Sequence, residues 1–161
     1  MTLDIRDAKA SDAPAIRAIL EGVIDHGGLT ALTKGAIDAA VTSKITQYVE
    51  TGSFIVAETD RVIGFQYTTP YPGASSHVAD IATFSEIGLR QTGIGRALFE
   101  ETKGRLKSKG FSKITARIRG DNTNGLPYYA KMGFRHVGIY EAHTLIDGKL
   151  VDQVLTEFLI K

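Results

Sequence analysis

The stretch that decides the fold is Arg90–Leu98, "RQTGIGRAL", in which two glycines stand one residue apart before a run that reads as a helix. Such a turn can be a plain turn, a helix cap or a cradle for phosphate, because the first turn of a helix presents unpaired N–H groups and a partial positive charge. Arg90, Gln91 and Arg96 add donors that can pair with phosphate oxygens. The stretch therefore indicates an anion site, with the plain turn as the alternative.

Two common phosphate loops are excluded by the residues that follow the glycines. No Gly-Lys-Ser/Thr comes after them, as a Walker A loop requires. Leu98 occupies the place of the third glycine of a dinucleotide fingerprint. Other segments of the sequence are needed to identify the phosphate ligand.

Hydrophobic periodicity predicts helices and strands on both sides of the glycine stretch. A helix is expected over 93–109, and Ser11 offers a hydroxyl cap to a helix over 16–24. Ile37, Val41, Ile45 and Tyr48 repeat at helical spacing and predict one continuous second helix. A short helix is expected within 122–134, and strands are expected over 3–8, 53–58, 62–69, 77–84, 113–118, 134–140 and 150–160. This order predicts one mixed α+β domain over residues 1–161.

Composition indicates a soluble domain without a specialised environment. Of 161 residues, 43% are hydrophobic and 23% are charged, and the formal net charge is +1. We therefore expect a cytoplasmic protein that binds neither nucleic acid nor membrane, with no leader and no spanning segment. The chain has no cysteine, which excludes a disulfide, a thiolate zinc site and an acyl-cysteine intermediate. The four histidines show no metal-ligand spacing, so no metal site is expected.

A second stretch of sequence decides between the interpretations of the glycine turn. Arg90-x-x-Gly-x-Gly is followed, after a helix and a strand, by Asn122 and "YYAKMGF" (128–134). The two segments together resemble the GCN5-related N-acetyltransferase (GNAT) superfamily, and the resemblance extends over nearly the whole chain. Within it, "VIGFQYTTPY" (62–71), "GDNTNG" (120–125) and "DGKLVDQV" (147–154) are most similar to the phosphinothricin and small amino-acid N-acetyltransferase branch. That branch usually carries a glutamate where this chain has Asp80.

The resemblance implies the GNAT acyl-CoA acyltransferase fold: a mixed, mostly antiparallel sheet of about seven strands, with two splayed parallel central strands and four flanking helices. It also implies acetyl-coenzyme A (acetyl-CoA) as cofactor, lying between the strands at 77–85 and 113–118. The side chain of Phe84 is expected to be core. The cofactor-binding residues implied are Thr83, Phe84, Ser85, Arg90, Gln91, Thr92, Gly93, Ile94, Gly95, Arg96, Asn122 and Tyr129.

The same resemblance assigns the chemistry to a small set of side chains. Tyr129 is the expected general acid, because a phenol can give a proton to a departing thiolate, whereas Tyr128 is expected to be structural. Asp80 is the expected base, either directly or through water. The candidates for the acceptor pocket are His26, Tyr67, Tyr71, His77 and His143, of which His77 and His143 are also alternative bases.

The function expected from these residues is transfer of an acetyl group from acetyl-CoA to the primary amine of a small molecule, an amino acid or an analogue such as phosphinothricin. Without a cysteine, we expect direct transfer in a ternary complex. A non-catalytic module that senses acetyl-CoA, and an acetyltransferase acting on a protein or peptide amine, are the alternatives. The resemblance also suggests a homodimer.

Overall fold

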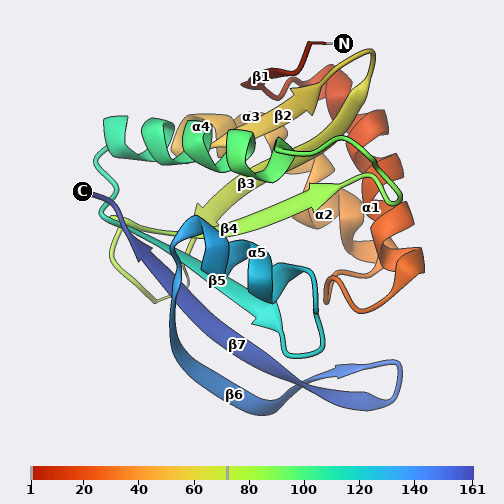
Figure 1. Cartoon of the computed structure of the whole chain (residues 1–161), viewed down its shortest axis with the longest axis vertical. Coiled ribbons are helices and arrows are strands. Elements are labelled where there is room, and N and C mark those ends of the chain that lie inside the picture. Colours follow the sequence, from red (N-terminus) through yellow and green to blue (C-terminus); the bar gives the residue numbers. More distant parts are fainter. Residues whose placement is uncertain (1, 72) are drawn as a thin grey trace.

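The strands form one mixed sheet in the computed structural model, which describes residues 2–71 and 73–161 (Figure 1). Within those residues seven strands pair in the order β1-β2-β3-β4-β5-β7-β6. All neighbours are antiparallel except β4 and β5. This confirms the predicted α+β fold. The strands are β1 (Asp4–Asp7), β2 (Phe54–Glu58), β3 (Val62–Pro70), β4 (Val78–Ser85), β5 (Lys113–Arg119), β6 (Arg135–Ile146) and β7 (Lys149–Leu159).

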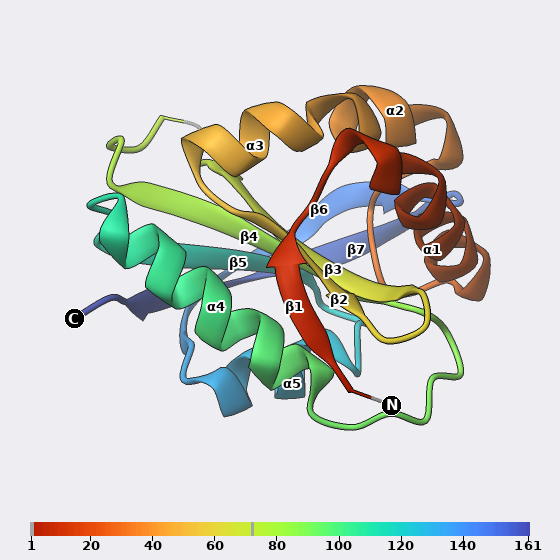
Figure 2. The same cartoon turned by 90° about the horizontal axis from the view of Figure 1, so that it is seen from above.

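Helices cover both faces of the sheet (Figure 2). One face carries α1 (Ala13–His26), α2 (Ile37–Ala40) and α3 (Ile45–Thr51), and the other carries α4 (Ile94–Ser108) and α5 (Gly125–Met132). Each face buries its own apolar cluster against the sheet: Phe65 of β3 is fully buried on the face of α1, and Phe99 of α4 is buried on the other. Burial of such side chains is the main stabilising term of a fold of this kind.

The parallel pair β4–β5 separates soon after it begins. Three residue pairs join the two strands, the last of them Asp80↔Thr115. Beyond that pair β4 continues to Ser85 and β5 to Arg119 without pairing to each other. The predicted splay is confirmed, and it leaves backbone N–H and C=O groups of β4 free on the side that faces β5.

The prediction of one continuous second helix is wrong, although its buried face is correct. The segment consists of α2, α3 and short 3₁₀ turns, because Val41 adopts non-helical angles (φ −132°, ψ −65°) between them. Ile37, Val41 and Ile45 are nevertheless all buried. β-Branched residues lower helix propensity, and Val41 and Thr42 stand together at the break. Core packing therefore keeps the apolar spacing while the backbone changes direction.

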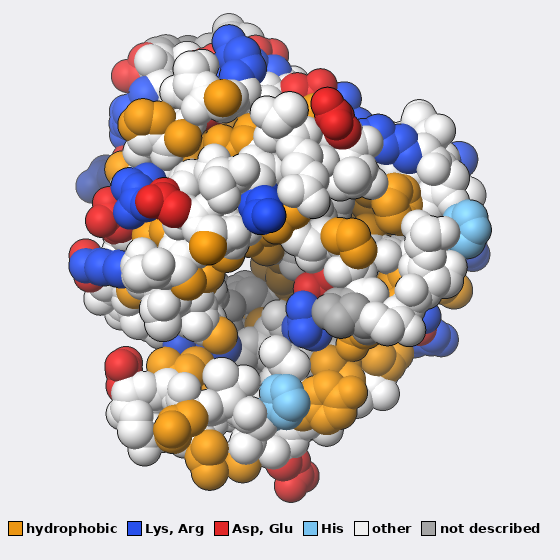
Figure 3. Space-filling view, turned by 180° about the vertical axis from the view of Figure 1, so that it is seen from behind, with side chains coloured by type: hydrophobic (Ala, Val, Ile, Leu, Met, Phe, Trp, Pro, Cys, Tyr) orange, Lys and Arg blue, Asp and Glu red, His pale blue; other side chains and the backbone are white. Residues whose placement is uncertain are grey.

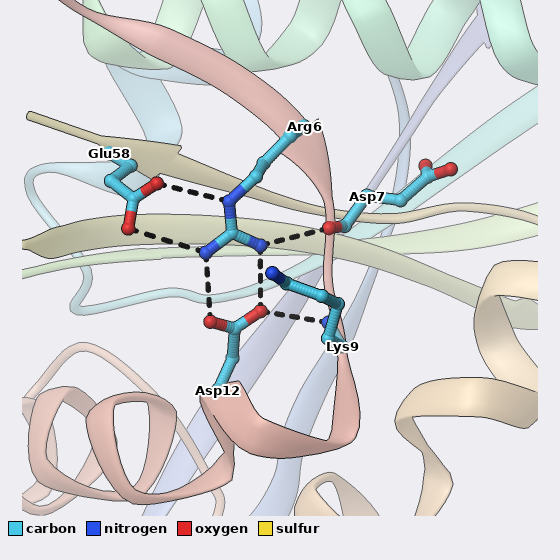
Figure 4. Close-up of polar contacts among 5 residues, drawn as sticks. All are labelled: Arg6, Asp7, Lys9, Asp12 and Glu58. Carbon is cyan, nitrogen blue, oxygen red and sulfur yellow. Dashed lines mark hydrogen bonds and ion pairs between the residues drawn. The ribbon is translucent and has the colours of Figure 1, made fainter.

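Ser11 does not cap the first helix. That position belongs to Asp12, whose Oδ2 accepts the N–H of Lys9 at 2.8 Å. Asp12 also accepts two hydrogen bonds from Arg6, each 2.9 Å, and Arg6 Nε donates to Glu58 at 3.1 Å (Figure 4). This network ties β1 and β2 to the start of α1, and the Arg6 guanidinium holds the pKa of Asp12 below its usual range.

The hairpin of β6 and β7 is longer than the sequence predicts. β6 continues past Tyr140 to Ile146, and the pairing is irregular between Tyr140 and Thr144. Ala142 takes a positive φ of 46° there, and its N–H donates to Asp152 Oδ1 at 2.9 Å. In the described part of the chain, no helix is both long enough and apolar enough to cross a membrane.

Candidate active site

A cavity of about 830 Å³ opens where β4 and β5 diverge. Residues from both faces of the sheet line it, including the glycine turn before α4, the loop after α1 and the start of α5. Seen from the side opposite α4 and α5, the surface is hollowed near its middle (Figure 3). Of the predicted site residues, the cavity is lined by Asp80, Thr83, Phe84, Ser85, Gln91, Gly93, Ile94, Gly95, Asn122 and Tyr129.

The two glycines before α4 have different structural roles. Gly93 caps the helix with a left-handed backbone (φ 82°), and the space where its Cβ would lie is open. A Cβ on Gly95 would instead meet Tyr128 Cε1 at 2.5 Å. The first intrahelical bond of this turn runs from Ala97 to Gly93, so the preceding N–H groups point out of the helix end beside the cavity. Arg90, Thr92 and Arg96 are exposed and do not line the cavity.

Tyr128 and Tyr129 lie together at the inner end of the cavity and make different hydrogen bonds. Tyr128 donates to the carbonyl of Gly95 at 2.7 Å, which joins α5 to the glycine turn. The Tyr129 hydroxyl lies 2.8 Å from Thr83 Oγ1. Burial raises the pKa of Tyr128 to about 12, and it raises the pKa of the buried Tyr129 still further above its usual range. Both phenols are therefore protonated near neutral pH.

Asp80 is held in an ion pair. Its Oδ2 accepts hydrogen bonds from Arg117 Nη2 at 2.8 Å and Nε at 3.1 Å, and its Oδ1 accepts one from Thr115 at 2.8 Å. The guanidinium of Arg117 lies 5.3 Å from the centre of the Tyr71 ring. Arg117 stands two residues after Thr115 on β5, and no motif in the sequence marks it as a partner of Asp80.

The predicted acid and base lie on opposite faces of the sheet. Residues alternate along β4, so Ile81 and Thr83 face α4 and α5, whereas Asp80 and Phe84 face α1 and α3. In a continuous sheet the two groups would be separated by the paired backbone. Here the strands part just beyond Asp80, and the cavity connects the two faces.

Two of the predicted aromatic site residues belong to a stack under α3. The Tyr67 ring lies 5.6 Å from Tyr48 and 5.1 Å from Phe54, and burial raises its pKa above the usual range. Phe84 lies 5.4 Å from Phe65, as expected for a core aromatic, although one part of it borders the cavity. Tyr67 does not line the cavity, which leaves Tyr71 near it through Arg117.

The three candidate histidines are exposed and lie apart from the cavity lining. His26 ends α1 and contacts the carbonyl of Gly27 at 2.9 Å. His77 lies before the paired end of β4, and its Nδ1 is 3.0 Å from the carbonyl of Gly110. His143 stacks on Tyr140 in the β6–β7 hairpin.

Two side chains, from the end of β5 and from the turn that follows it, hydrogen-bond to the loop after α1, which lines the cavity. Asn122 Oδ1 accepts the N–H of Gly125, the first residue of α5, at 2.8 Å, and Asn122 Nδ2 donates to the Leu29 carbonyl at 3.3 Å. Arg119 Nη1 donates to the Thr30 carbonyl at 2.8 Å. Sequence reasoning found Asn122 but missed Arg119, because its partner is a backbone atom distant in the chain.

The described residues were also compared with the arrangement that a metal site requires. Among residues 2–71 and 73–161, no group of three or more His, Asp or Glu side chains is arranged to hold a metal ion.

Comparison with known proteins gives one family. The model of the Acetyltransferase (GNAT) family matches residues 31–134. The mycothiol acetyltransferase of Amycolatopsis mediterranei is 31% identical over 106 residues, which cover 62% of this chain and 35% of that protein. The chain thus spans about a third of the length of the curated relatives it matches.

Solved structures agree on the fold. A phosphinothricin acetyltransferase from Sinorhizobium meliloti in complex with AcCoA has a TM-score of 0.83 at 22% identity, covering 99% of this chain and 89% of that one. A ribosomal-protein-alanine N-acetyltransferase from Brucella melitensis has a TM-score of 0.81 at 19% identity, covering 97% and 99%. The fold is therefore shared by proteins named for small-molecule and for protein substrates, and it does not choose between them.

Proposed function

The chain belongs to the acetyltransferase (GNAT) family, and from that premise we propose that it transfers an acetyl group from acetyl-CoA directly to the primary amine of a small molecule. The observation that carries this proposal is the cavity between β4 and β5. It joins the Tyr129 side of the sheet to the Asp80 side, beginning at the pair Asp80↔Thr115 where the strands part.

The residues present fit acetyl-CoA. From Ile81 to Ser85, the backbone of β4 is paired to β3 on one side and has no strand partner on the β5 side, where it can take up the amides of an extended arm as a neighbouring strand would. The open space beside Gly93 and the N-terminus of the 15-residue helix α4 suit a pyrophosphate. When bound, acetyl-CoA supplies the activated acetyl group as a thioester. The curated relatives and solved neighbours carry the same family activity in their names.

In this proposal the protein moves two protons. Tyr129 Oη holds the proton that the departing sulfur takes up, since burial keeps the phenol protonated. On the opposite face, Asp80 accepts a proton from the amine through water, because Arg117 and Thr115 occupy the near sides of its carboxylate. An amino group with a reference pKa of about 8 is partly neutral at pH 7, so a weak base suffices.

The charges that line the cavity favour a small zwitterionic acceptor. Asp80 and Asp152 line the cavity together with Arg117 and Arg119, so both signs of charge are present within it. An amino acid or an analogue carries the complementary ammonium and carboxylate groups. The name of the Sinorhizobium meliloti neighbour supports phosphinothricin as one compound to test.

The test is a turnover screen. The purified chain is incubated with acetyl-CoA and each of the standard amino acids, phosphinothricin and an alanine-ended peptide, and the released thiol is followed. The chain has no cysteine and adds no thiol of its own. We expect turnover with at least one small amine. Turnover with the peptide alone would contradict a small-molecule acceptor and indicate a protein or peptide amine. Binding of acetyl-CoA without any turnover would indicate a non-catalytic module that senses acetyl-CoA.

We also propose that the chain is a single domain and forms a homodimer through the β6–β7 hairpin. Large apolar side chains are exposed there, among them Val137, Ile139, Tyr140, Leu145 and Leu150. Contiguous exposed apolar surface is typical of interaction sites. Light scattering on a size-exclusion column should give twice the chain mass, and Leu145→Lys combined with Leu150→Lys should give a monomer.

A further inference from the structure

We propose that Gln66 and Thr83 are positioning residues that turn a hydrogen-bond donor toward the Tyr129 oxygen and so prepare it to give up its proton. The inference rests on the proposed role of Tyr129 as general acid. It concerns two side chains, one on β3 and one on β4, that stand opposite each other in the sheet and lie on the face of α4 and α5.

The four polar groups form a connected network. Gln66 Nε2 donates to Thr83 Oγ1 at 2.9 Å and to Tyr128 Oη at 3.1 Å, which uses both of its protons. Tyr128 donates its own proton to the Gly95 carbonyl, which can only accept. Thr83 Oγ1 then lies 2.8 Å from Tyr129 Oη. The proton of Tyr128 therefore has a fixed acceptor. Thr83 and Tyr129 have two hydroxyl protons and one hydrogen bond between them, so within this network one proton of that pair has no fixed acceptor.

The proposed role of Tyr129 as an acid decides which hydroxyl donates in the hydrogen bond between Thr83 and Tyr129. A phenol that releases a proton leaves an oxygen bearing negative charge, and that oxygen needs a donor when it is buried. Thr83 can be this donor: Gln66 Nε2 fills one of the two acceptor positions of its hydroxyl, and its single proton is available to point at Tyr129. The bond strengthens as charge develops on Oη, which is the kind of interaction that favours a transition state over a ground state.

The burial of Gln66 argues that it is retained for a function. Its side chain is fully buried, and its Oε1 has no hydrogen-bond partner. Burying an unpaired acceptor is unfavourable, and an apolar side chain of similar size would avoid this cost. The opposite amide orientation would leave two donors unpaired instead of one acceptor. A purely structural role would not require an amide at this place.

The experiment compares matched variants of Thr83 and Gln66. Thr83→Val removes the hydroxyl and keeps the shape, Thr83→Ser keeps the hydroxyl, and Gln66→Met keeps the length without the amide. With the most active amine of the screen, Thr83→Val and Gln66→Met should lower kcat about 10- to 100-fold. Thr83→Ser should restore most of it, and KM for acetyl-CoA should change little. Gln66→Met should melt at the same temperature as the wild type or higher.

A double-variant cycle separates positioning from packing. If Thr83 acts through the phenol, Thr83→Val should have almost no further effect in a Tyr129→Phe background. Equal losses of kcat in the two backgrounds would overturn the inference and leave the proposed acid in place. Full turnover in Tyr129→Phe alone would overturn the acid assignment and this inference with it.

A readout without cofactor or substrate completes the test. With 3-fluorotyrosine at position 129, the environment of the phenol can be followed by ¹⁹F NMR in the free protein at neutral pH. Because the ¹⁹F resonance responds to a hydrogen bond at the phenol oxygen, Thr83→Val should move it, and Thr83→Ser should leave it near the wild-type position. An unchanged resonance in Thr83→Val would overturn the inference.

Discussion

Placing a negative charge at Gly93 tests the anion site most directly. Gly93 has a left-handed backbone, and nothing occupies the space of its Cβ. Asp and Asn are the side chains that tolerate this conformation best. Gly93→Asp therefore introduces a carboxylate at the end of α4 without a clash, and Gly93→Asn introduces the same shape without the charge. Gly95 is unsuitable for this experiment because any side chain there would collide with Tyr128.

The expected effect follows from the charges. Two unit charges about 4 Å apart interact by roughly 4 kcal/mol at an effective dielectric constant near 20. Salt and solvent reduce this interaction at an open site, and we take about 2 kcal/mol, which weakens binding about 30-fold. Acetyl-CoA at about 100 times its Kd stabilises a protein by about 2.7 kcal/mol, and for a domain of this size that raises Tm by about 5–11 °C. In Gly93→Asp the increase should fall to about 2–3 °C.

Thermal denaturation with and without acetyl-CoA measures this directly, because each variant serves as its own unliganded reference. The strain of a side chain at Gly93 lowers Tm in both states and cancels in the difference. Gly93→Asn should keep most of the increase. An undiminished increase in Gly93→Asp, or an equal loss in both variants, would refute the placement of the pyrophosphate at the glycine turn.

Three further predictions concern stability, kinetic order and the acceptor loop. Asp12→Asn should lower the free energy of unfolding at pH 7 by about 1–2 kcal/mol. Because the folded-state pKa of Asp12 is depressed, the difference in stability between wild type and variant should shrink as the pH falls below about 4. Urea denaturation at pH 7 and pH 3 measures both values. Initial-rate plots against acetyl-CoA at several amine concentrations should intersect, since no cysteine is present to form an acyl-enzyme, and parallel lines would contradict direct transfer. Arg119→Gln should raise KM for the amine several-fold, because the bond to the Thr30 carbonyl is lost, while the acetyl-CoA-induced increase in Tm stays as in the wild type.

Local signals predicted most of the fold. The glycines at both ends of α4, the apolar spacing of α1 and the turn at Gly148 act within a few residues, and a single sequence contains that information. The break at Val41 was missed because both halves of the segment bury the same apolar face, so the helical spacing continues across a backbone that is not helical.

Motifs mark part of the candidate site, whereas its other contacts join distant parts of the chain and leave no local signal. The glycine turn and the pair of tyrosines were found by pattern, but the hydrogen bonds that distinguish the two tyrosines come from Gln66 and Thr83 on other strands. Gln66 lies within a strand whose buried positions are mostly apolar, and its spacing gives no sign of its partner. Only the register of β3 against β4 brings it opposite Thr83.

The ion pair of Asp80 and Arg117 shows how the same geometry holds the side chain that we propose as the base. The carboxylate lies at the last residue where β4 still pairs with β5, so Thr115 and Arg117 on the neighbouring strand reach it, and its place at the opening of the cavity is fixed. An acceptor with its own carboxylate would compete for Arg117 and would loosen the hold on Asp80 as it binds. The position of Asp80 at the fork of the two strands, within reach of Arg117, is what makes this coupling possible.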